Sequence, residues 1–242
     1  MTDIKPIETE YAGYKFRSRL EARWAIFFDA CGADWEYEPQ GYTLQDGTKY
    51  LPDFLLHGVA LSGLNRYRRR SKGDVYVEIK GVVTEEARKK LEMFSGRYEY
   101  DHFRGKNPDK PFDSAELLAS IQKPTIALGR IPRGDTYLDL VRDAELQEMQ
   151  SKEFLFSDFY AMGSEVYSMG KVIVLPFLRM PYINKRGALT FGYDAFGDLY
   201  SYEGMVLDPD YAVDISATCK AYTEARQARF EWGETPRRCT IK

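Results

Sequence analysis

The sequence predicts an α/β fold, and two kinds of pattern support this prediction. Apolar residues recur at helical spacing in some segments, whereas other segments are short apolar or alternating runs between turn residues, as expected for strands. Residues 14–130 follow the order helix, three strands, helix, strand, with one short extra helix before the last strand. Helices and strands in this order can cover one another, so these residues complete an α/β layer arrangement by themselves.

The first element is a helix predicted over residues 16–31. Apolar side chains recur along one face of a 3.6-residue period, and Gly32 follows as a natural stop. The side chains on that face are Leu20, Trp24, Phe27, Phe28 and Cys31. Residues 34–39 then alternate in polarity and end at Pro39, which predicts a short strand.

The next predicted elements are strands. Residues 41–44 and 49–56 flank Asp46-Gly47, a dipeptide that favours a hairpin turn. Residues 75–80 form a further strand in which alternate side chains are apolar. Its apolar face carries Val75, Val77 and Ile79.

The later part of the chain contains more helices and strands. Thr84 is a predicted N-cap, and the helix after it carries Ala87, Leu91 and Phe94 on its inner face. The other predicted elements are a short helix at 114–121, a strand at 125–128, a helix at 137–150, a strand at 171–178 and a helix at 211–231.

Composition places the chain among globular proteins. Of its 242 residues 44% are hydrophobic and 29% charged, and the formal net charge is −3. No general basic field attracts nucleic acid, so a nucleic-acid-binding function would depend on a local basic patch. The cysteines and histidines lack the spacing of a zinc site, and no apolar run approaches the ~20 residues of a membrane span. We expect a reduced, cytoplasmic protein without membrane contact.

The most informative stretch is residues 51–81, where acids and a lysine occur in two apolar runs. Glu78 and Lys80 are two residues apart, so on a strand both side chains leave the same face. If the run containing Asp53 is the neighbouring strand, Asp53 meets them at one spot. Two carboxylates beside an ammonium favour Mg²⁺, and the carbonyl of Ile79 is a candidate third ligand. Lys80 would orient or help to deprotonate an attacking water.

The same residues also allow plainer interpretations. The second run is compatible with an amphipathic strand whose solvent face carries Tyr76, Glu78 and Lys80. Glu21 lies beside the apolar stripe of the first helix and is a candidate to support the metal site. It also completes a capping box with Ser18, in which it would only satisfy the amide of the cap.

A strongly basic run lies between the two acid-bearing segments. Arginines interleaved with a tyrosine suit phosphate contacts and base stacking, and a solvated loop is the alternative. The candidate nucleic-acid-binding residues of this run are Arg66, Tyr67, Arg68, Arg69, Arg70 and Lys72. Arg17 and Arg19, at the start of the first helix, are further phosphate candidates with a weaker claim.

Four segments of this chain together resemble the PD-(D/E)XK nuclease superfamily, and within it the small phage and prophage members. They are Phe16-Arg17-Ser18-Arg19-Leu20-Glu21-Ala22-Arg23-Trp24-Ala25, Trp35-Glu36-Tyr37-Glu38-Pro39, Leu51-Pro52-Asp53-Phe54 and Val77-Glu78-Ile79-Lys80-Gly81. The matching segments span residues 11–130, the expected nuclease-like core. Residues 131–242 would be a C-terminal α+β extension that packs on this core or forms an accessory lobe.

The resemblance implies a restriction-endonuclease-like αβββαβ core, with a mixed central sheet flanked by helices, and dependence on Mg²⁺ or Mn²⁺. Asp53 and Glu78 then match the acids of the motif, Lys80 matches its lysine, and Glu21 matches the first-helix glutamate that often assists the metal. The connection between Asp53 and Glu78 is longer than in compact members, with residues 59–73 as the excess.

The expected function is therefore that of a Mg²⁺-dependent endonuclease acting on DNA, encoded by a phage and working in the host cytoplasm. A ribonuclease is one alternative, because phosphate contacts do not report the sugar. A catalytically inactive protein that keeps the nuclease fold and binds a host or phage partner is another. The sequence leaves open the cleavage specificity, endo or exo action, and whether the chain forms a homodimer.

Overall fold

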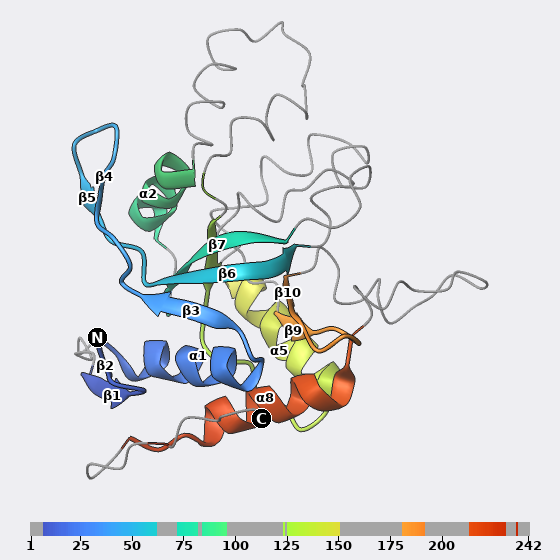
Figure 1. The fold of residues 1–242 in the computed structure, drawn as a ribbon. Helices are drawn as coiled ribbons and strands as arrows, with labels where there is room; N and C mark the ends of the chain where they lie inside the picture. The colour runs from blue at the N-terminus through green and yellow to red at the C-terminus, as the bar shows by residue number, and fades with distance from the viewer. Residues whose placement is uncertain are drawn as a thin grey trace, which may run out of the picture.

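The computed structural model describes residues 7–61, 72–81, 84–95, 123, 125–150, 181–191, 213–230 and 236. These residues form an α/β fold in which helices flank a mixed six-stranded sheet (Figure 1). The strands of this sheet are β3 (Asp34–Tyr37), β6 (Phe54–Leu61), β7 (Lys72–Ile79), β8 (Thr125–Leu128), β9 (Tyr182–Ile183) and β10 (Leu189–Phe191). The helices are α1 (Arg19–Ala30), α2 (Glu85–Ser95), α5 (Tyr137–Gln150) and α8 (Ile215–Gln227).

Two long strands form the centre of the sheet. β6 and β7 are antiparallel, and β8 lies parallel to β7 on its other side. Two strands pair with the edge of β6 that faces away from β7. β3 pairs antiparallel with the first half of β6, and β10 pairs parallel with its last residues. The β6–β7 register shifts between Leu56 and Val59, where Gly58 has a φ of 58° that favours glycine.

One face of the sheet is covered by α1 and α5, which enclose the main core. The apolar stripe predicted for the first helix is buried here, with Trp24, Phe27 and Phe28 at 2% exposure or less. Phe28 packs on Phe54 of β6 at 5.4 Å between ring centroids. α8 packs on the outer side of α1, where Tyr222 lies 4.4 Å from Phe27. The C-terminal elements thus pack against the N-terminal ones.

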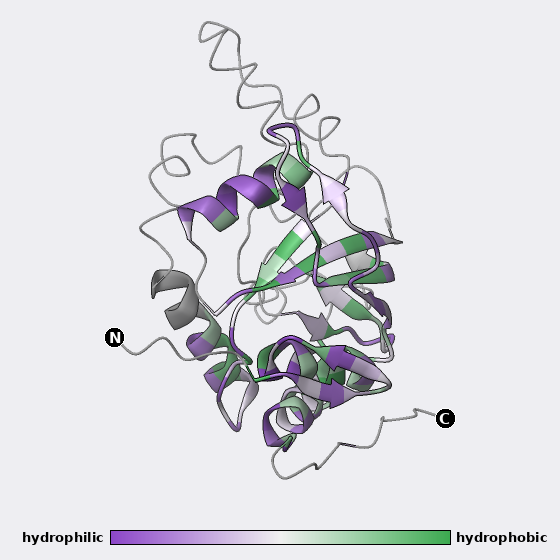
Figure 2. Ribbon diagram, turned by 90° about the vertical axis from the view of Figure 1, so that its left-hand side faces the viewer, coloured by the Kyte–Doolittle hydropathy of each residue, from purple (hydrophilic) through white to green (hydrophobic). Residues whose placement is uncertain are grey.

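The other face is covered by α2 and a hairpin. The hairpin consists of β4 (Tyr42–Thr43) and β5 (Lys49–Tyr50), and its tyrosines pack on Phe94 of α2 at 4.9 and 4.7 Å. α2 is largely hydrophilic and buries only one side, whereas the central strands are largely hydrophobic (Figure 2). On this face of β7, Glu78 is therefore buried and Tyr76 is half-buried.

Most of the predicted elements that the structure describes are confirmed within a few residues. The strand at 125–128 and the helix at 137–150 match β8 and α5, and the α2 helix begins after Thr84, whose Oγ1 accepts from the amide of Ala87 at 3.2 Å. The helix predicted at 211–231 is shorter, as α8. The helix predicted at 114–121 and the strand at 171–178 lie outside the described residues.

One prediction was wrong and one element was not predicted. Residues 49–56 do not form a single strand, because Pro52 and Asp53 separate β5 from β6. Proline has no amide proton for a sheet ladder, which accounts for the break. A hairpin of β1 (Thr9–Tyr11) and β2 (Tyr14–Phe16) precedes α1 and turns through Ala12 and Gly13, both at positive φ. Among the described helices, none has the length and apolarity to cross a membrane.

Asp29 ties three elements together at the C-terminal end of α1. Its carboxylate is 6% exposed and accepts hydrogen bonds from the hydroxyl of Tyr11 at 2.8 Å and from the indole N–H of Trp35 at 3.0 Å. These donors come from β1 and β3, so one buried acid joins the N-terminal hairpin and a sheet strand to α1. Buried donors that lose their acceptor carry the full desolvation penalty.

Replacing Asp29 by alanine should therefore destabilise the protein strongly. We expect the free energy of unfolding to fall by about 2–4 kcal/mol, because Tyr11 and Trp35 both lose their acceptor. Urea unfolding followed by circular dichroism measures the change. Asp34→Ala, at an exposed position of β3, is the matched control and should change stability little; equal losses in the two variants would contradict this role of Asp29.

Candidate active site

The pairing of β6 with β7 brings the predicted acids together. Phe54 is paired with Val77 in the antiparallel register, so the next residues along the two chains, Asp53 and Glu78, lie opposite each other. The sequence-based expectation that these two runs are neighbouring strands is confirmed. Both acids are buried, at 1% and 5% exposure. The interpretation of Glu78 as part of a solvent-facing strand surface is therefore wrong, because α2 and the β4–β5 hairpin cover that face.

Asp53 is held from two sides. Its Oδ2 accepts a hydrogen bond from the backbone amide of Ile79 at 2.6 Å, across the strand pair. Its Oδ1 is paired with the guanidinium of Arg17, which reaches over from the start of α1. The structure thus places the amide of Ile79 on Asp53, whereas the sequence analysis considered the carbonyl of Ile79 as a ligand.

Glu78 is held by a tyrosine and a lysine. Its Oε2 accepts from the hydroxyl of Tyr50 at 2.7 Å, and its Oε1 lies 2.7 Å from Nζ of Lys80. The backbone of Lys80 is fixed by a hydrogen bond from its amide to the carbonyl of Leu128 at 2.9 Å, at the end of β8. The two carboxylates and the ammonium therefore meet at one end of the central strands.

Burial and the neighbouring charges shift the pKa of Asp53 and that of Lys80. Burial, followed by the charge of Glu78, raises the pKa of Asp53 to about 7, although the amide of Ile79 and the cations Lys80 and Arg17 act in the opposite direction. Burial alone would lower the pKa of Lys80, but attraction to Glu78 and Asp53 raises it overall. Lys80 is therefore an ammonium at neutral pH, while Asp53 is poised between its two protonation states.

These residues fit a divalent cation that is bound mainly by carboxylates and water. Two buried acids repel each other, and a cation between them would remove that repulsion. Mg²⁺ keeps several waters and needs only one or two protein carboxylates in addition to substrate phosphates. Among the described residues, no three Asp, Glu, His or Cys side chains are grouped as a complete metal-binding set. Asp53 and Glu78 are the two acids that the fold offers.

Glu21 is buried in the cap of α1. Its Oε1 accepts from the hydroxyl of Ser18 at 2.8 Å, and the amide of Glu21 donates to Oγ of Ser18 at 3.2 Å. Its Oε2 accepts from the hydroxyl of Tyr37 at 2.7 Å and from the amide of Arg17 at 3.1 Å. The predicted cap is thus present, with Arg17 in place of Ser18 as the amide donor. Glu21 is linked to Asp53 through Arg17.

Arg17 connects the acids of the site. Its guanidinium contacts Asp53, lies 2.9 Å from Oε1 of Glu38, and is 4.0 Å from Oε2 of Glu21. Burial would lower the pKa of Arg17, but Asp53, Tyr37 and the two glutamates raise it overall. The side chain remains 53% exposed, so it can leave Asp53 without rearrangement of the core.

Three residues of the site were not predicted from the sequence: Tyr50, Tyr37 and Glu38. Tyr50 reaches Glu78 only because the β4–β5 hairpin folds onto the sheet. Glu38 has a φ of 48°, a left-handed conformation that is uncommon for a residue with a side chain. Its amide donates to the carbonyl of Asp53 at 2.9 Å, which fixes the chain in that turn. Of the three, only Tyr37 could have been found from the sequence. It is the last inward-facing residue of the alternating strand that ends before Pro39.

The remaining predicted nucleic-acid contacts lie elsewhere. Arg19 lines a pocket between α1 and the end of α8, together with Arg23 and Arg226. Residues 66–70 of the basic run lie outside the described residues, and Lys72 begins β7 opposite Ala60. Comparisons with protein-family models, with curated proteins and with solved structures found no match for this chain.

The raised pKa of Asp53 predicts a specific effect of pH on stability. In the unfolded chain its pKa is near 3.8, so between about pH 4 and pH 7 the folded state binds the extra proton and stability falls as pH rises. At about pH 8 without divalent metal, Asp53→Asn should be more stable than the wild type by roughly 1–3 kcal/mol. Below pH 4 this gain should vanish.

Thermal unfolding at a series of pH values measures the effect. Asp135→Asn, at an exposed position, is the matched control and should follow the wild type at every pH. A gain for Asp53→Asn that is equally large at low pH would show that charge burial is not its cause.

Proposed function

We propose that this protein is a metal-dependent nuclease that hydrolyses phosphodiester bonds in DNA. The observation that carries the proposal is the meeting of Asp53, Glu78 and Lys80 at one end of the β6–β7 pair. Burial, followed by the charge of Glu78, raises the pKa of Asp53 to about 7, and groups with such perturbed pKa values cluster at functional sites. The ammonium of Lys80, 2.7 Å from Glu78, adds a cation that can stabilise the negative charge developing on a phosphate during hydrolysis.

The order of the elements supports membership of the PD-(D/E)XK superfamily, which is part of the proposal. α1, β3, β6, β7, α2 and β8 follow the αβββαβ order of the restriction-endonuclease-like core, with the β4–β5 hairpin added between the first two sheet strands. Asp53 directly precedes the second strand of this series, Glu78 lies in the third and Lys80 directly follows it, which is the order that the resemblance implies.

Each residue of the site would have a distinct task. Asp53 and Glu78 would hold the metal, which supplies charge stabilisation and lowers the pKa of a water. Lys80 donates hydrogen bonds to that water or to a phosphate oxygen, where negative charge develops. Tyr50 fixes the orientation of Glu78. Arg17 is free to bind a phosphate once its contact with Asp53 is released, because its side chain is more than half exposed.

The decisive experiment is a nuclease assay with a lysine variant. The wild type should nick or degrade DNA in the presence of Mg²⁺ or Mn²⁺ and stop when a chelator is added. Lys80→Ala should lower the rate by about a hundredfold or more, because a donor to the developing charge is lost. Lys89→Ala, at an exposed position of α2, is the matched control and should cut at the wild-type rate.

Labelled single- and double-stranded DNA and RNA are tested side by side. Cleavage by Lys80→Ala at the wild-type rate would refute the assignment, and cleavage of RNA alone would make the protein a ribonuclease.

Tyr50 should act as a positioning residue for Glu78. Tyr50→Phe removes one hydrogen bond to the carboxylate, and we expect the Mg²⁺ concentration at half-maximal activity to rise by about tenfold, as for other outer partners of metal ligands. The titration of activity with Mg²⁺ measures this shift. Tyr42→Phe is the control on the same hairpin, because its hydroxyl bonds to Tyr76 at 2.8 Å. If both variants respond alike, the hairpin acts only through folding.

One observation favours a second candidate function. The guanidinium of Arg17 occupies an oxygen of Asp53 that the metal would use, as expected for a nuclease fold that binds a partner without catalysis. In that case calorimetry should detect no Mg²⁺ binding by the wild type, and Arg17→Ala, which frees the oxygen of Asp53, should restore it. Mg²⁺ binding by the wild type would exclude this alternative.

A further inference from the structure

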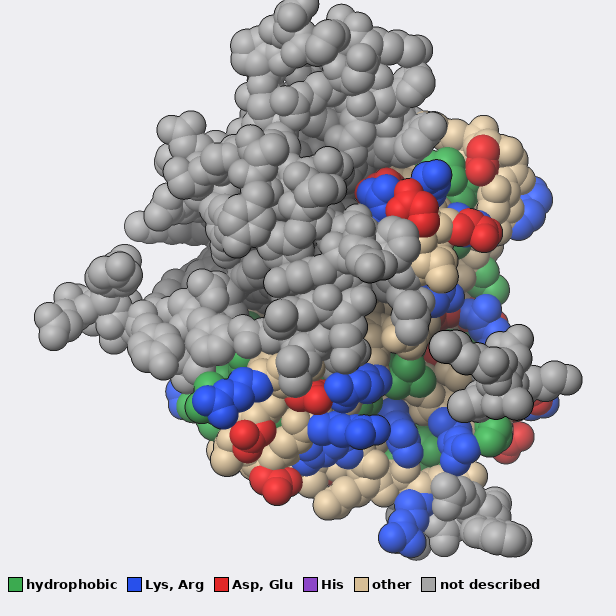
Figure 3. All heavy atoms as spheres, turned by 180° about the vertical axis from the view of Figure 1, so that it is seen from behind, with side chains coloured by type: hydrophobic (Ala, Val, Ile, Leu, Met, Phe, Trp, Pro, Cys, Tyr) green, Lys and Arg blue, Asp and Glu red, His purple; other side chains and the backbone are tan. Residues whose placement is uncertain are grey.

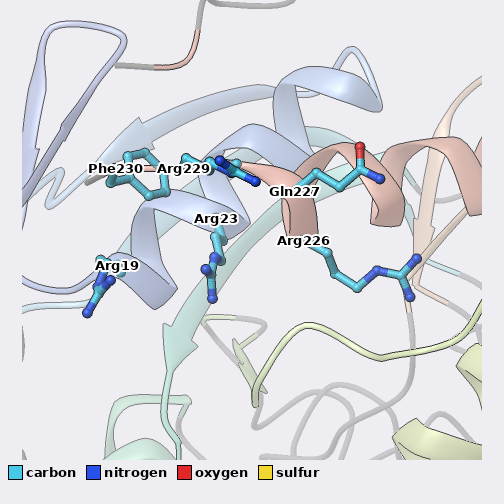
Figure 4. A pocket seen from close by; sticks show the side chains of 7 residues that line it. Arg19, Arg23, Arg226, Gln227, Arg229 and Phe230 are labelled. Carbon is cyan, nitrogen blue, oxygen red and sulfur yellow. The ribbon is translucent and has the colours of Figure 1, made fainter. Parts of the chain in front are cut away.

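A cleft between the start of α1 and the end of α8 is lined mainly by arginines. Its volume is about 770 Å³ (Figure 4), and a second pocket of about 290 Å³ adjoins it through the shared residues Arg23 and Arg226. We call the two together the α1–α8 cleft. Its arginines are Arg19, Arg23, Arg130, Arg133, Arg226 and Arg229. They come from α1, from the segment between β8 and α5, and from the end of α8.

Two arginines of this cleft have hydrogen-bond partners in α5 or in the segment between β8 and α5. Arg130 is paired with Asp143 through both of its terminal nitrogens, and Arg226 donates to the carbonyl of Gly134. None of the described residues that line the two pockets is acidic. Nε of Arg23 is buried and has no hydrogen-bond partner among the described residues. Arg229 is exposed at the outer end of the cleft.

The cleft is a local basic patch on a protein whose formal net charge is −3. Seen from behind, Lys and Arg side chains gather across the lower part of the molecule, at the height of α1 and α8 (Figure 3). This is the kind of patch that an acidic nuclease needs for binding its substrate. It is made of residues remote from the basic run that the sequence analysis singled out.

The cleft and the candidate active site share a boundary at the end of β8. The amide of Lys80 donates to the carbonyl of Leu128, and the indole N–H of Trp24 donates to the carbonyl of Gly129 at 2.8 Å. α1 belongs to both regions, because Glu21 contacts the site while Arg19 and Arg23, one turn apart, line the cleft. A strand bound in the cleft would therefore pass α1 and the end of β8, the two elements that the cleft shares with the site.

The chemistry of the lining indicates an extended polyanion. Guanidinium groups match the geometry of phosphate oxygens with paired hydrogen bonds. The arginines are distributed over two adjoining pockets and three segments of the chain, which suits successive phosphates better than a single small anion. Phe230, Leu20 and Ile131 are the large apolar side chains beside these arginines among the described lining residues.

We infer that the α1–α8 cleft binds the phosphate backbone of DNA next to the bond to be cut, an inference that rests on the proposed function. It assigns to α8, which lies outside the nuclease-like core, a direct part in holding the substrate. It also gives Arg23, Arg226 and Arg229 a role that their positions in the sequence do not suggest.

Binding of labelled duplex DNA, measured with a chelator present over a range of salt concentrations, tests the inference. Arg19→Gln/Arg229→Gln should weaken binding by about tenfold or more and make the salt dependence shallower by about two phosphate contacts. Lys89→Gln/Lys220→Gln removes the same charge from exposed positions outside the cleft and should retain both the affinity and the slope. Circular dichroism verifies that each variant is folded, and Arg229→Gln alone, at an exposed position, replaces the double variant if that one unfolds.

Unchanged binding by the arginine variant, or an equal loss in the lysine control, would overturn the inference. Competition by duplex RNA as strong as by DNA would assign the cleft to the phosphate backbone of either nucleic acid, and competition by inorganic phosphate at low concentration would reduce it to a single-anion site. Because binding is measured without metal, its outcome is separate from cleavage. If the cleft binds DNA but the protein does not cleave it, only the proposed nuclease activity is refuted. If the protein cleaves DNA but the arginine variant binds it with unaltered affinity, only the proposed role of the cleft is refuted.

Discussion

The close approach of two buried carboxylates, those of Asp53 and Glu78, is the constraint on which the rest of the site depends. Two carboxylates buried at one end of a strand pair repel each other where water screens them poorly. Three side chains from different elements contact these carboxylates. Lys80, at the end of β7, and Tyr50, from the β4–β5 hairpin, contact Glu78, and Arg17, before the start of α1, contacts Asp53. Without these partners the acids would have to separate or take up protons.

This arrangement contrasts with that of two other buried acids, Asp29 and Glu21. Asp29 receives two neutral donors and Glu21 caps a helix, so both acids stabilise the elements that they join. Asp53 instead has its pKa raised to about 7, which means that burial and its neighbour make the charged form unfavourable. A group that lowers stability in this way is retained where function needs it, in line with the trade-off between stability and activity.

The sequence predicted the elements whose patterns are local. The stripe of α1 and the alternation of β7 follow from periodicity, and neighbouring strands 25 residues apart bring Asp53 to Glu78. Contacts that depend on how separate elements pack were not predictable. Tyr50 reaches the site through a hairpin that folds back, Glu38 through a left-handed turn, and the cleft unites Arg23 with Arg226 from opposite ends of the chain.

Arg17 gives the proposed function a way to couple metal and substrate. A guanidinium and a divalent cation compete for the same carboxylate of Asp53, so metal binding has to displace Arg17 from it. The displaced side chain keeps Glu38 as a partner at 2.9 Å, but it gains most from a new anion, such as a phosphate of the substrate. If the proposed function holds, each ligand would remove part of the free-energy cost of binding the other, which is positive coupling between two sites. The same ion pair would lower the metal affinity of the protein without substrate, so that Arg17 would favour binding of the metal together with DNA.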